Sequence, residues 1–162
     1  MNRIPFIVLL VLVFSACSNA PTPPVIPAPL QPTKIELQIE ANSKLNLDIS
    51  GNSSPVMFRV YELKDTSSFN NADFFALMEK DQTVLANDLS RKHEVTLKIG
   101  ESKMLSLSTE KDVKALCFFA SFRKLDDADW RICNEILANR DQKIVVRVKD
   151  NKIALDKLII EK

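Results

Sequence analysis

Glycine and histidine are scarce in this sequence, and their scarcity excludes several classes of enzyme. The 162 residues include two glycines, Gly51 and Gly100, and one histidine, His93. Phosphate-binding loops and dinucleotide-binding turns need several closely spaced glycines, and a serine or cysteine nucleophile needs a base within reach. His93 alternates with Val95 and Leu97, which is typical of a strand residue whose ring is hydrogen-bonded. We therefore predict no catalytic residue, no cofactor and no small-molecule substrate.

Neither sign of charge is in excess. Lysine and arginine number 22 against 21 aspartates and glutamates, and Arg3 lies in a segment that we expect to be removed, so the remaining chain is neutral. Nucleic-acid binding depends on a basic surface that releases counterions from phosphate, and attraction to anionic lipid depends on clustered basic residues. The sequence therefore predicts no nucleic-acid partner, and it predicts that any membrane attachment uses a covalent lipid.

No hydrophobic run is long enough to cross a bilayer. The longest extends only from Ile4 to Phe14, whereas a spanning helix needs about 20 residues. Arg3 precedes this run and the small residues Ser15 and Ala16 follow it, which is the arrangement of a secretory signal. We expect residues 1–16 to be removed on export.

Two cleavage sites compete around Cys17. Residues 14–16 resemble a bacterial lipoprotein signal, in which the cysteine becomes the first residue and carries diacylglycerol and an N-acyl chain; Phe14 stands where leucine is usual. Residues 18–20 fit an ordinary signal peptidase, which would remove Cys17. Pro21 would directly follow that second cut and disfavours it. We therefore predict that Cys17 is lipidated.

Proline is concentrated in one short segment. Six of the eight prolines lie between Pro21 and Pro32. Such a segment cannot form a helix or the interior of a sheet, and it favours polyproline II. At about 3.1 Å per residue, the stretch from Ser18 to Pro32 would span up to about 45 Å. We interpret residues 17–32 as a lipidated cysteine followed by a spacer.

From residue 33 onward the hydrophobic period becomes that of β-strands. In KIELQIE the apolar residues Ile35, Leu37 and Ile39 alternate with polar ones, as in a strand with one buried face. The segment ALCFFASF is apolar on both faces, which predicts a central strand. We expect residues 33–162 to form a mainly β domain, a two-sheet sandwich of seven or eight strands with one short helix. The predicted strands cover residues 34–40, 56–63, 92–99, 103–108, 115–122, 130–137, 143–149 and 152–160.

One segment breaks the strand pattern. In SSFNNADFFALMEKD, Phe74, Leu77 and Met78 recur at helical spacing. Asn71 is expected to cap this helix, with Asp73 in its first turn. We therefore predict a single short helix between two strands.

Two cysteines, Cys117 and Cys133, lie on strands that we expect to pair, and export would place them where disulfides form. If Ala120 faces Trp130, Cys117 faces Cys133 and a bridge is possible. A shift of register by one residue would put the two side chains on opposite faces. The sequence therefore leaves two alternatives, a disulfide between Cys117 and Cys133 or two free buried thiols.

The segment LDDADW carries three carboxylates, Asp126, Asp127 and Asp129. Carboxylate oxygens are ligands for calcium, but aspartates also favour turns because they bond to their own backbone. The glycine and the distal glutamate of a calcium loop are missing. We interpret the segment as a hairpin loop without a metal site.

The segment ANSKLNLDISGNSSP, residues 41–55, is long for a connection between strands. It carries Leu45, Leu47 and Ile49 at alternate positions. These residues could enter the core or form an edge strand, or they could form an exposed apolar loop that contacts a partner. The residues alone slightly favour the first interpretation.

Three motifs together resemble one family. ISGNSSPVMFRVYELK, FNNADFFALMEKDQTVLANDL and ALCFFASFRKLDDADWR are similar, in this order, to the TssJ (VasD-like) outer-membrane lipoproteins of type VI secretion systems. The likeness extends from about Lys34 to Val148. It implies a transthyretin-like, immunoglobulin-like β-sandwich with an added helix, tethered to the periplasmic face of the outer membrane. Ser18, directly after the cysteine, is compatible with sorting to that membrane.

The resemblance also implies a partner, the periplasmic C-terminal region of the inner-membrane protein TssM, which with TssL completes a trans-envelope complex. In the family the loop between the first two strands contributes to this contact, which reverses the preference for a buried segment. Leu47 and Asn52-Ser53 stand where relatives often carry proline and Arg-Pro. The predicted contact residues are Leu45, Asn46, Leu47, Asp48, Ile49, Ser50, Gly51 and Asn52.

The expected role is that of a structural lipoprotein. The alternative is another outer-membrane lipoprotein that acts as a chaperone or pilotin for an envelope assembly. An enzyme of envelope chemistry is a third possibility, and it would have to act through His93 or through the aspartates of LDDADW.

Overall fold

The structure is a computed structural model, and it describes residues 32–160, apart from the side chains of residues 157–160. The predicted signal at residues 1–16, lipidation of Cys17 and the spacer up to residue 31 lie outside the described residues. Within the described range, no helix has both the length and the apolar character to cross a membrane.

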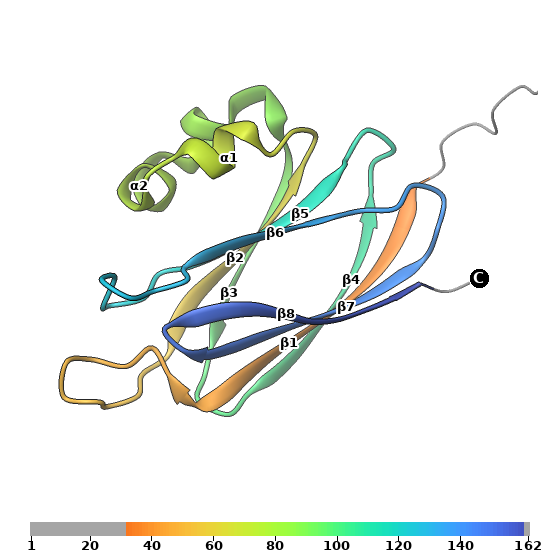
Figure 1. Cartoon of the computed structure of the whole chain (residues 1–162). Helices are drawn as coiled ribbons and strands as arrows, with labels where there is room; N and C mark the ends of the chain where they lie inside the picture. The colour runs from red at the N-terminus through yellow and green to blue at the C-terminus, as the bar shows by residue number, and fades with distance from the viewer. Residues whose placement is uncertain (1–31, 161–162) are drawn as a thin grey trace, which may run out of the picture.

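The domain is a sandwich of two four-stranded sheets (Figure 1), as the sequence predicts. One sheet has the strand order β4-β1-β7-β8 and the other β3-β2-β5-β6. Strand β1 pairs antiparallel with β4 and parallel with β7, and the other neighbours are antiparallel. The strands are β1 (Thr33–Leu45), β2 (Val56–Leu63), β3 (Leu89–Leu97), β4 (Ser102–Thr109), β5 (Ala115–Ala120), β6 (Arg131–Glu135), β7 (Gln142–Asp150) and β8 (Lys152–Ile160).

The main core lies between the two sheets. Alternate residues of β1, among them Leu37 and Ile39, are fully buried there because one face of the strand points inward. Phe58 of β2 and Phe118 of β5 face them, with stacked rings whose centroids are 6.1 Å apart. Every residue of β5 is buried, and β5 is a central strand as predicted.

A helical insertion between β2 and β3 covers the outer face of β2 and β5 (Figure 1). It comprises α1 (Ser67–Asn71), α2 (Phe74–Leu85) and the 3-10 turn η1 (Ala86–Asp88). The predicted helix between the two strands is present as α2, but the predicted cap is wrong: Asn71 ends a shorter helix, α1, and extended Ala72 separates the two. Asp73 caps α2 by accepting a hydrogen bond from the backbone N–H of Ala76 at 2.9 Å, which satisfies an otherwise unpaired helix donor.

A charged network fastens α2 to the sheet. Arg59 on β2 donates to the carbonyl of Leu77 at 2.9 Å, and its guanidinium lies 3.3 Å from the carboxylate of Asp81. Asp81 also accepts hydrogen bonds from the Tyr61 hydroxyl and from Lys92, each at 2.9 Å. Arg59 and Asp81 are both nearly buried, and each has a second charged partner, Glu94 at 2.8 Å from Arg59 and Lys92 at 2.9 Å from Asp81.

We expect acid to weaken this network. Burial would raise the pKa of Asp81, but hydrogen bonds from Lys92 and Tyr61 outweigh burial and lower it. Such a group stabilises the fold above its unfolded pKa of about 3.9, and the contribution is lost as pH falls through the folded pKa. The free energy of unfolding from urea titrations should therefore decline below about pH 4, and less steeply in Asp81→Asn. Identical pH profiles for the two proteins would contradict this.

A disulfide joins Cys117 of β5 to Cys133 of β6. The register that aligns these residues places Ala120 opposite Trp130, whose carbonyl accepts the Ala120 N–H at 2.9 Å. Of the two alternatives open from the sequence, the structure contains the bridge. It fastens the edge strand β6 to a central strand.

Candidate functional site

The loop between β1 and β2, residues 46–55, projects from one end of the sandwich (Figure 1). The loop between β5 and β6, residues 121–130, and the turn between β7 and β8 lie at the same end, whereas Thr33 lies at the opposite end. Strand β1 extends beyond the predicted Glu40 to Leu45, because Leu45 pairs with Asp150 and enters the core. The free loop is therefore shorter than residues 41–55.

The residues predicted to contact a partner fall into two groups. Leu45 and Asn46 have exposed fractions of 0% and 3%, so they support the loop from inside. Leu47 and Asp48 are half-buried, and Ile49 is 94% exposed at the apex. Its neighbours Ser50, Gly51 and Asn52 are also exposed. The surface available to a partner therefore comprises residues 47–52.

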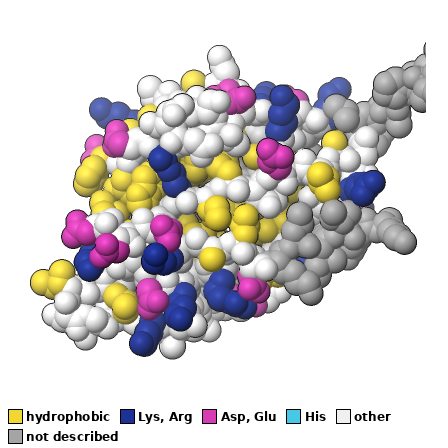
Figure 2. All heavy atoms as spheres, in the orientation of Figure 1, with side chains coloured by type: hydrophobic (Ala, Val, Ile, Leu, Met, Phe, Trp, Pro, Cys, Tyr) yellow, Lys and Arg dark blue, Asp and Glu magenta, His cyan; other side chains and the backbone are white. Residues whose placement is uncertain are grey.

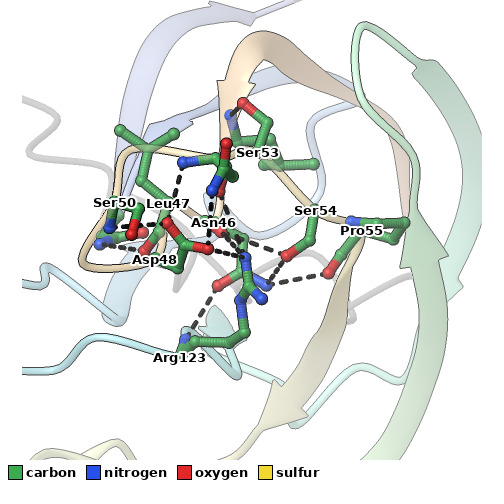
Figure 3. A network of polar contacts seen from close by, with 11 residues as sticks. Asn46, Leu47, Asp48, Ser50, Ser53, Ser54, Pro55 and Arg123 are labelled. Carbon is green, nitrogen blue, oxygen red and sulfur yellow. Dashed lines mark hydrogen bonds and ion pairs between the residues drawn. The ribbon is translucent and has the colours of Figure 1, made fainter.

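Asn46 fixes the base of the loop (Figure 3). It has a left-handed backbone with φ of 50°, a conformation that asparagine tolerates better than most residues. Its backbone N–H donates to the carbonyl of Asp150 at 2.7 Å. Its side-chain amide donates to the Pro55 carbonyl at 2.9 Å and to the Ser54 hydroxyl at 3.0 Å, while its Oδ1 accepts from the backbone N–H of Arg123 at 2.8 Å.

Asp48 closes the tip of the loop. Its Oδ1 accepts from the backbone N–H groups of Ser50 and Asn52 at 2.8 and 2.9 Å. These bonds, chiefly that from Asn52, lower the pKa of the Asp48 carboxyl, so it is ionised at neutral pH. Gly51 supplies the turn with φ of 82°, a conformation that costs glycine little. The tip is thus a closed turn that holds Ile49 outward.

Arg123, in the loop after β5, braces the tip from the side (Figure 3). Its Nη2 donates to the carbonyls of Asn46 at 3.3 Å and Asn52 at 3.2 Å, and lies 3.8 Å from the carboxylate of Asp48. Arg123 and Leu125 line, together with Asp48 and Ile49, a hollow of about 410 Å³ beside the tip. The sequence does not reveal this role, because Arg123 and Asn46 lie 77 positions apart and no spacing rule links them.

Substitution of Asn46 should separate its two contributions to the loop. Asn46→Ala loses the side-chain hydrogen bonds and leaves alanine, which tolerates a left-handed backbone less well than asparagine, at this position, so we expect stability to fall by about 2 kcal/mol. Asn46→Gly loses the same bonds without that strain and should be about 1 kcal/mol more stable than Asn46→Ala. Urea denaturation of both variants measures the difference. Equal stabilities would show that the left-handed backbone contributes nothing.

The other candidate residues have structural surroundings. His93 lies on β3, and its Nε2 is 2.8 Å from a carboxylate oxygen of the buried Glu62, which confirms a strand residue with a bonded ring. The aspartates of LDDADW lie in the β5–β6 loop as predicted, where Asp127 pairs with Lys124 at 3.6 Å. Within residues 32–160, no group of three or more His, Cys, Asp or Glu side chains could hold a metal ion.

Solved structures of type VI secretion proteins resemble this chain. The lipoprotein TssJ1 from Pseudomonas aeruginosa is 28% identical with a TM-score of 0.74, covering 81% of this chain and 98% of that chain. A chain of a type VI membrane complex is 26% identical with a TM-score of 0.69, covering 78% and 100%. Serratia marcescens Lip, a membrane-bound component of the type VI secretion system, is 21% identical with a TM-score of 0.71, covering 78% and 99%, and supports the fold alone.

A search of curated protein sequences finds no match. A family model described as type VI secretion lipoprotein (VasD, EvfM, TssJ) matches residues 33–151, from the start of β1 to the turn between β7 and β8. This range includes every strand except β8, together with the helical insertion and the braced loop. The chain therefore belongs to the type VI secretion lipoprotein family of VasD, EvfM and TssJ.

Proposed function

We propose that this protein is the outer-membrane-anchored structural lipoprotein of a type VI secretion membrane complex. Its β1–β2 loop binds the periplasmic C-terminal region of TssM, and the lipid on Cys17 fixes TssM, and indirectly TssL, to the outer membrane. The observation that carries the proposal is Ile49, a branched aliphatic side chain 94% exposed at the apex of a loop whose base is buried and hydrogen-bonded.

The bracing of the loop suits it to recognition. A flexible loop loses conformational entropy when it is ordered by a partner, and this loss weakens binding. Asn46, Asp48 and Arg123 already hold residues 47–52 in one arrangement. An apolar anchor beside a hollow, with charged groups at its rim, is typical of the centre of a protein interface. Membership of the lipoprotein family and likeness to a chain of a type VI membrane complex support this partner.

The position of the loop suits a tethered adaptor. The start of β1, which follows the predicted lipidated segment, lies at the end of the sandwich opposite to the β1–β2 loop (Figure 1). The nine residues of β7 run between these ends, a length of roughly 30 Å. When the lipid anchor lies on the Thr33 side, the loop is directed away from the membrane. Buried acyl chain contributes about 0.8 kcal/mol per CH₂, and more than one chain gives stable anchoring.

The function follows from these parts without chemical turnover. The lipid resists removal from the membrane, the sandwich transmits load through its sheets, and the loop holds the partner. None of these steps requires a catalytic residue or a cofactor.

Anchoring is tested by metabolic labelling with a radioactive fatty acid and by membrane fractionation of wild type and Cys17→Ala. The wild type should be labelled and should sediment with the outer membrane, while Cys17→Ala should carry no label. Label on the variant, or an unlabelled wild type, would overturn the anchor. Partner binding is tested separately by titrating the purified periplasmic region of TssM with the chain carrying Cys17→Ser. Absence of a complex would overturn the proposed partner.

A further inference from the structure

A strip of partly exposed apolar side chains crosses the open side of the sandwich, where the edge strands β6 and β8 approach each other (Figure 2). At one end, Phe74 and Phe75 of α2 form an aromatic patch with Trp130. The Phe74 ring centroid lies 5.3 Å from the centroids of both other rings, and Phe75 is 62% exposed. From this patch the strip continues along Ile132, Ile136 and Leu155, which are all half-buried.

The strip connects the two ends of the domain. Trp130 belongs to the β5–β6 loop, which lies at the same end as the β1–β2 loop. Ile136 follows β6 toward the other end, where Gln142 begins β7 and pairs with Ile35. The chain that precedes Thr33 therefore joins the domain near the far end of the strip.

The preceding segment has a composition that fits such a surface. Residues 18–31, SNAPTPPVIPAPLQ, carry no charge and include the aliphatic residues Val25, Ile26 and Leu30 among five prolines. A spacer that served only as a length of chain would not need these aliphatic residues. Grooves lined by aromatic side chains bind proline-rich segments in the polyproline II conformation. Proline prevents such a segment from extending a sheet edge, so the contact would be made by side chains.

The segment is long enough to reach the aromatic patch. The strip runs along β6, and the six residue steps from Trp130 to Ile136 cover roughly 20 Å of extended chain. Fourteen residues of polyproline II span about 43 Å at about 3.1 Å per residue. A covalently attached segment also has an effective concentration in the millimolar range, so a contact with a dissociation constant of about 1 mM would be half occupied.

We propose that residues 18–31 dock along this strip, with their prolines against Phe75 and Trp130. Docking places Cys17 beside the aromatic patch, at the end of the domain that carries the β1–β2 loop. Release of the segment moves the anchor to the opposite end and lengthens the tether. The tether between Cys17 and the domain would thus be short when the segment is docked and long when it is released. Docking of the segment does not depend on which partner the β1–β2 loop binds.

Trp130 is the single tryptophan of the chain and reports on the patch directly. The chain from residue 17 onward, with Cys17→Ser, is compared with the same chain carrying Val25→Asp and Ile26→Asp. A matched control carries Asn19→Asp and Gln31→Asp, which add the same charge at polar positions of the segment. We expect the acrylamide quenching constant of Trp130 to rise roughly twofold with the aliphatic substitutions and to stay unchanged in the control.

Equal quenching constants in the three chains would overturn the proposal. The same holds for shielding that increases with protein concentration, because it would assign the strip to a second copy of the chain. A second measurement uses a nitroxide attached to Cys17, whose thiol is free while Cys117 and Cys133 are bridged. Docking requires that it broaden the NMR signals of Trp130 and Phe75, and unbroadened signals would overturn it.

Discussion

Replacing Ile49 with aspartate should weaken binding to the periplasmic region of TssM by roughly 30- to 1,000-fold, the effect of losing about 2–4 kcal/mol at the centre of an interface. Ile49 stands 94% exposed in the free protein, so the substitution changes little inside the fold. In a complex, the same position would have to bury a carboxylate without a partner, which is unfavourable. Isothermal titration of TssM with wild type and Ile49→Asp measures the difference.

A matched control lies on the outer face of the sheet formed by β4, β1, β7 and β8. Met104 on β4 is also apolar and 57% exposed, and it lies outside the loop. Met104→Asp should bind TssM with wild-type affinity, and both variants should melt within about 2 °C of wild type because exposed substitutions cost little stability. Leu47→Asp should also weaken binding, but it is half-buried and its melting temperature has to be compared first.

Other outcomes of this binding experiment would contradict the proposed site. If Ile49→Asp binds as tightly as wild type while Met104→Asp does not, the partner contacts the outer face of β4 and the proposed site is wrong. If both variants bind normally, neither surface is used. Since both substitutions add one negative charge, a general electrostatic effect would reduce the two affinities equally, and it is thereby separated from a local contact.

Period-two alternation predicts the strands well where both faces are regular. Strand β2 covers residues 56–63 as predicted, although it does not alternate, because the helical insertion buries its outer face as well as its inner one. Strand β1 was harder to delimit, since a register shift between Ala41 and Leu45 breaks the alternation before the strand ends. The prediction of the helix cap fails for a similar reason. Asn71 and Asp73 both fit the pattern of a residue that caps a helix, and the structure shows that Asp73 is the cap of α2.

The candidate site also has features that are predicted from the sequence and features that only the structure shows. The exposed tip of the β1–β2 loop is predicted from the family resemblance, whereas the alternation of Leu45, Leu47 and Ile49 alone slightly favours burial of the segment. The bracing of the loop could not be predicted, since Asn46 reaches Asp150 and Arg123 through contacts that only the packed sandwich creates. The buried position of Leu45 likewise depends on its pairing with Asp150. Tertiary contacts therefore decide both which aliphatic residue of the loop is exposed and how firmly the loop is held.

The disulfide should account for a large part of the stability of the domain. Cys117 and Cys133 are separated by 16 positions, and a bridge that closes a loop of this length stabilises a protein by about 3 kcal/mol, mainly by restricting the unfolded chain. We therefore expect Cys117→Ala with Cys133→Ala to lower the free energy of unfolding by about 3 kcal/mol in urea titrations. Wild type under strong reductant should show a similar loss.

The same substitution tests how the loop is held, because the chain closed by the bridge contains Arg123. If the bridge restrains this segment in the folded protein, its removal should also weaken TssM binding, by a smaller factor than Ile49→Asp, through a less well ordered brace. If the bridge acts only on the unfolded chain, affinity at temperatures well below the melting point should remain that of wild type. Stability and affinity measured on one variant therefore separate the two roles.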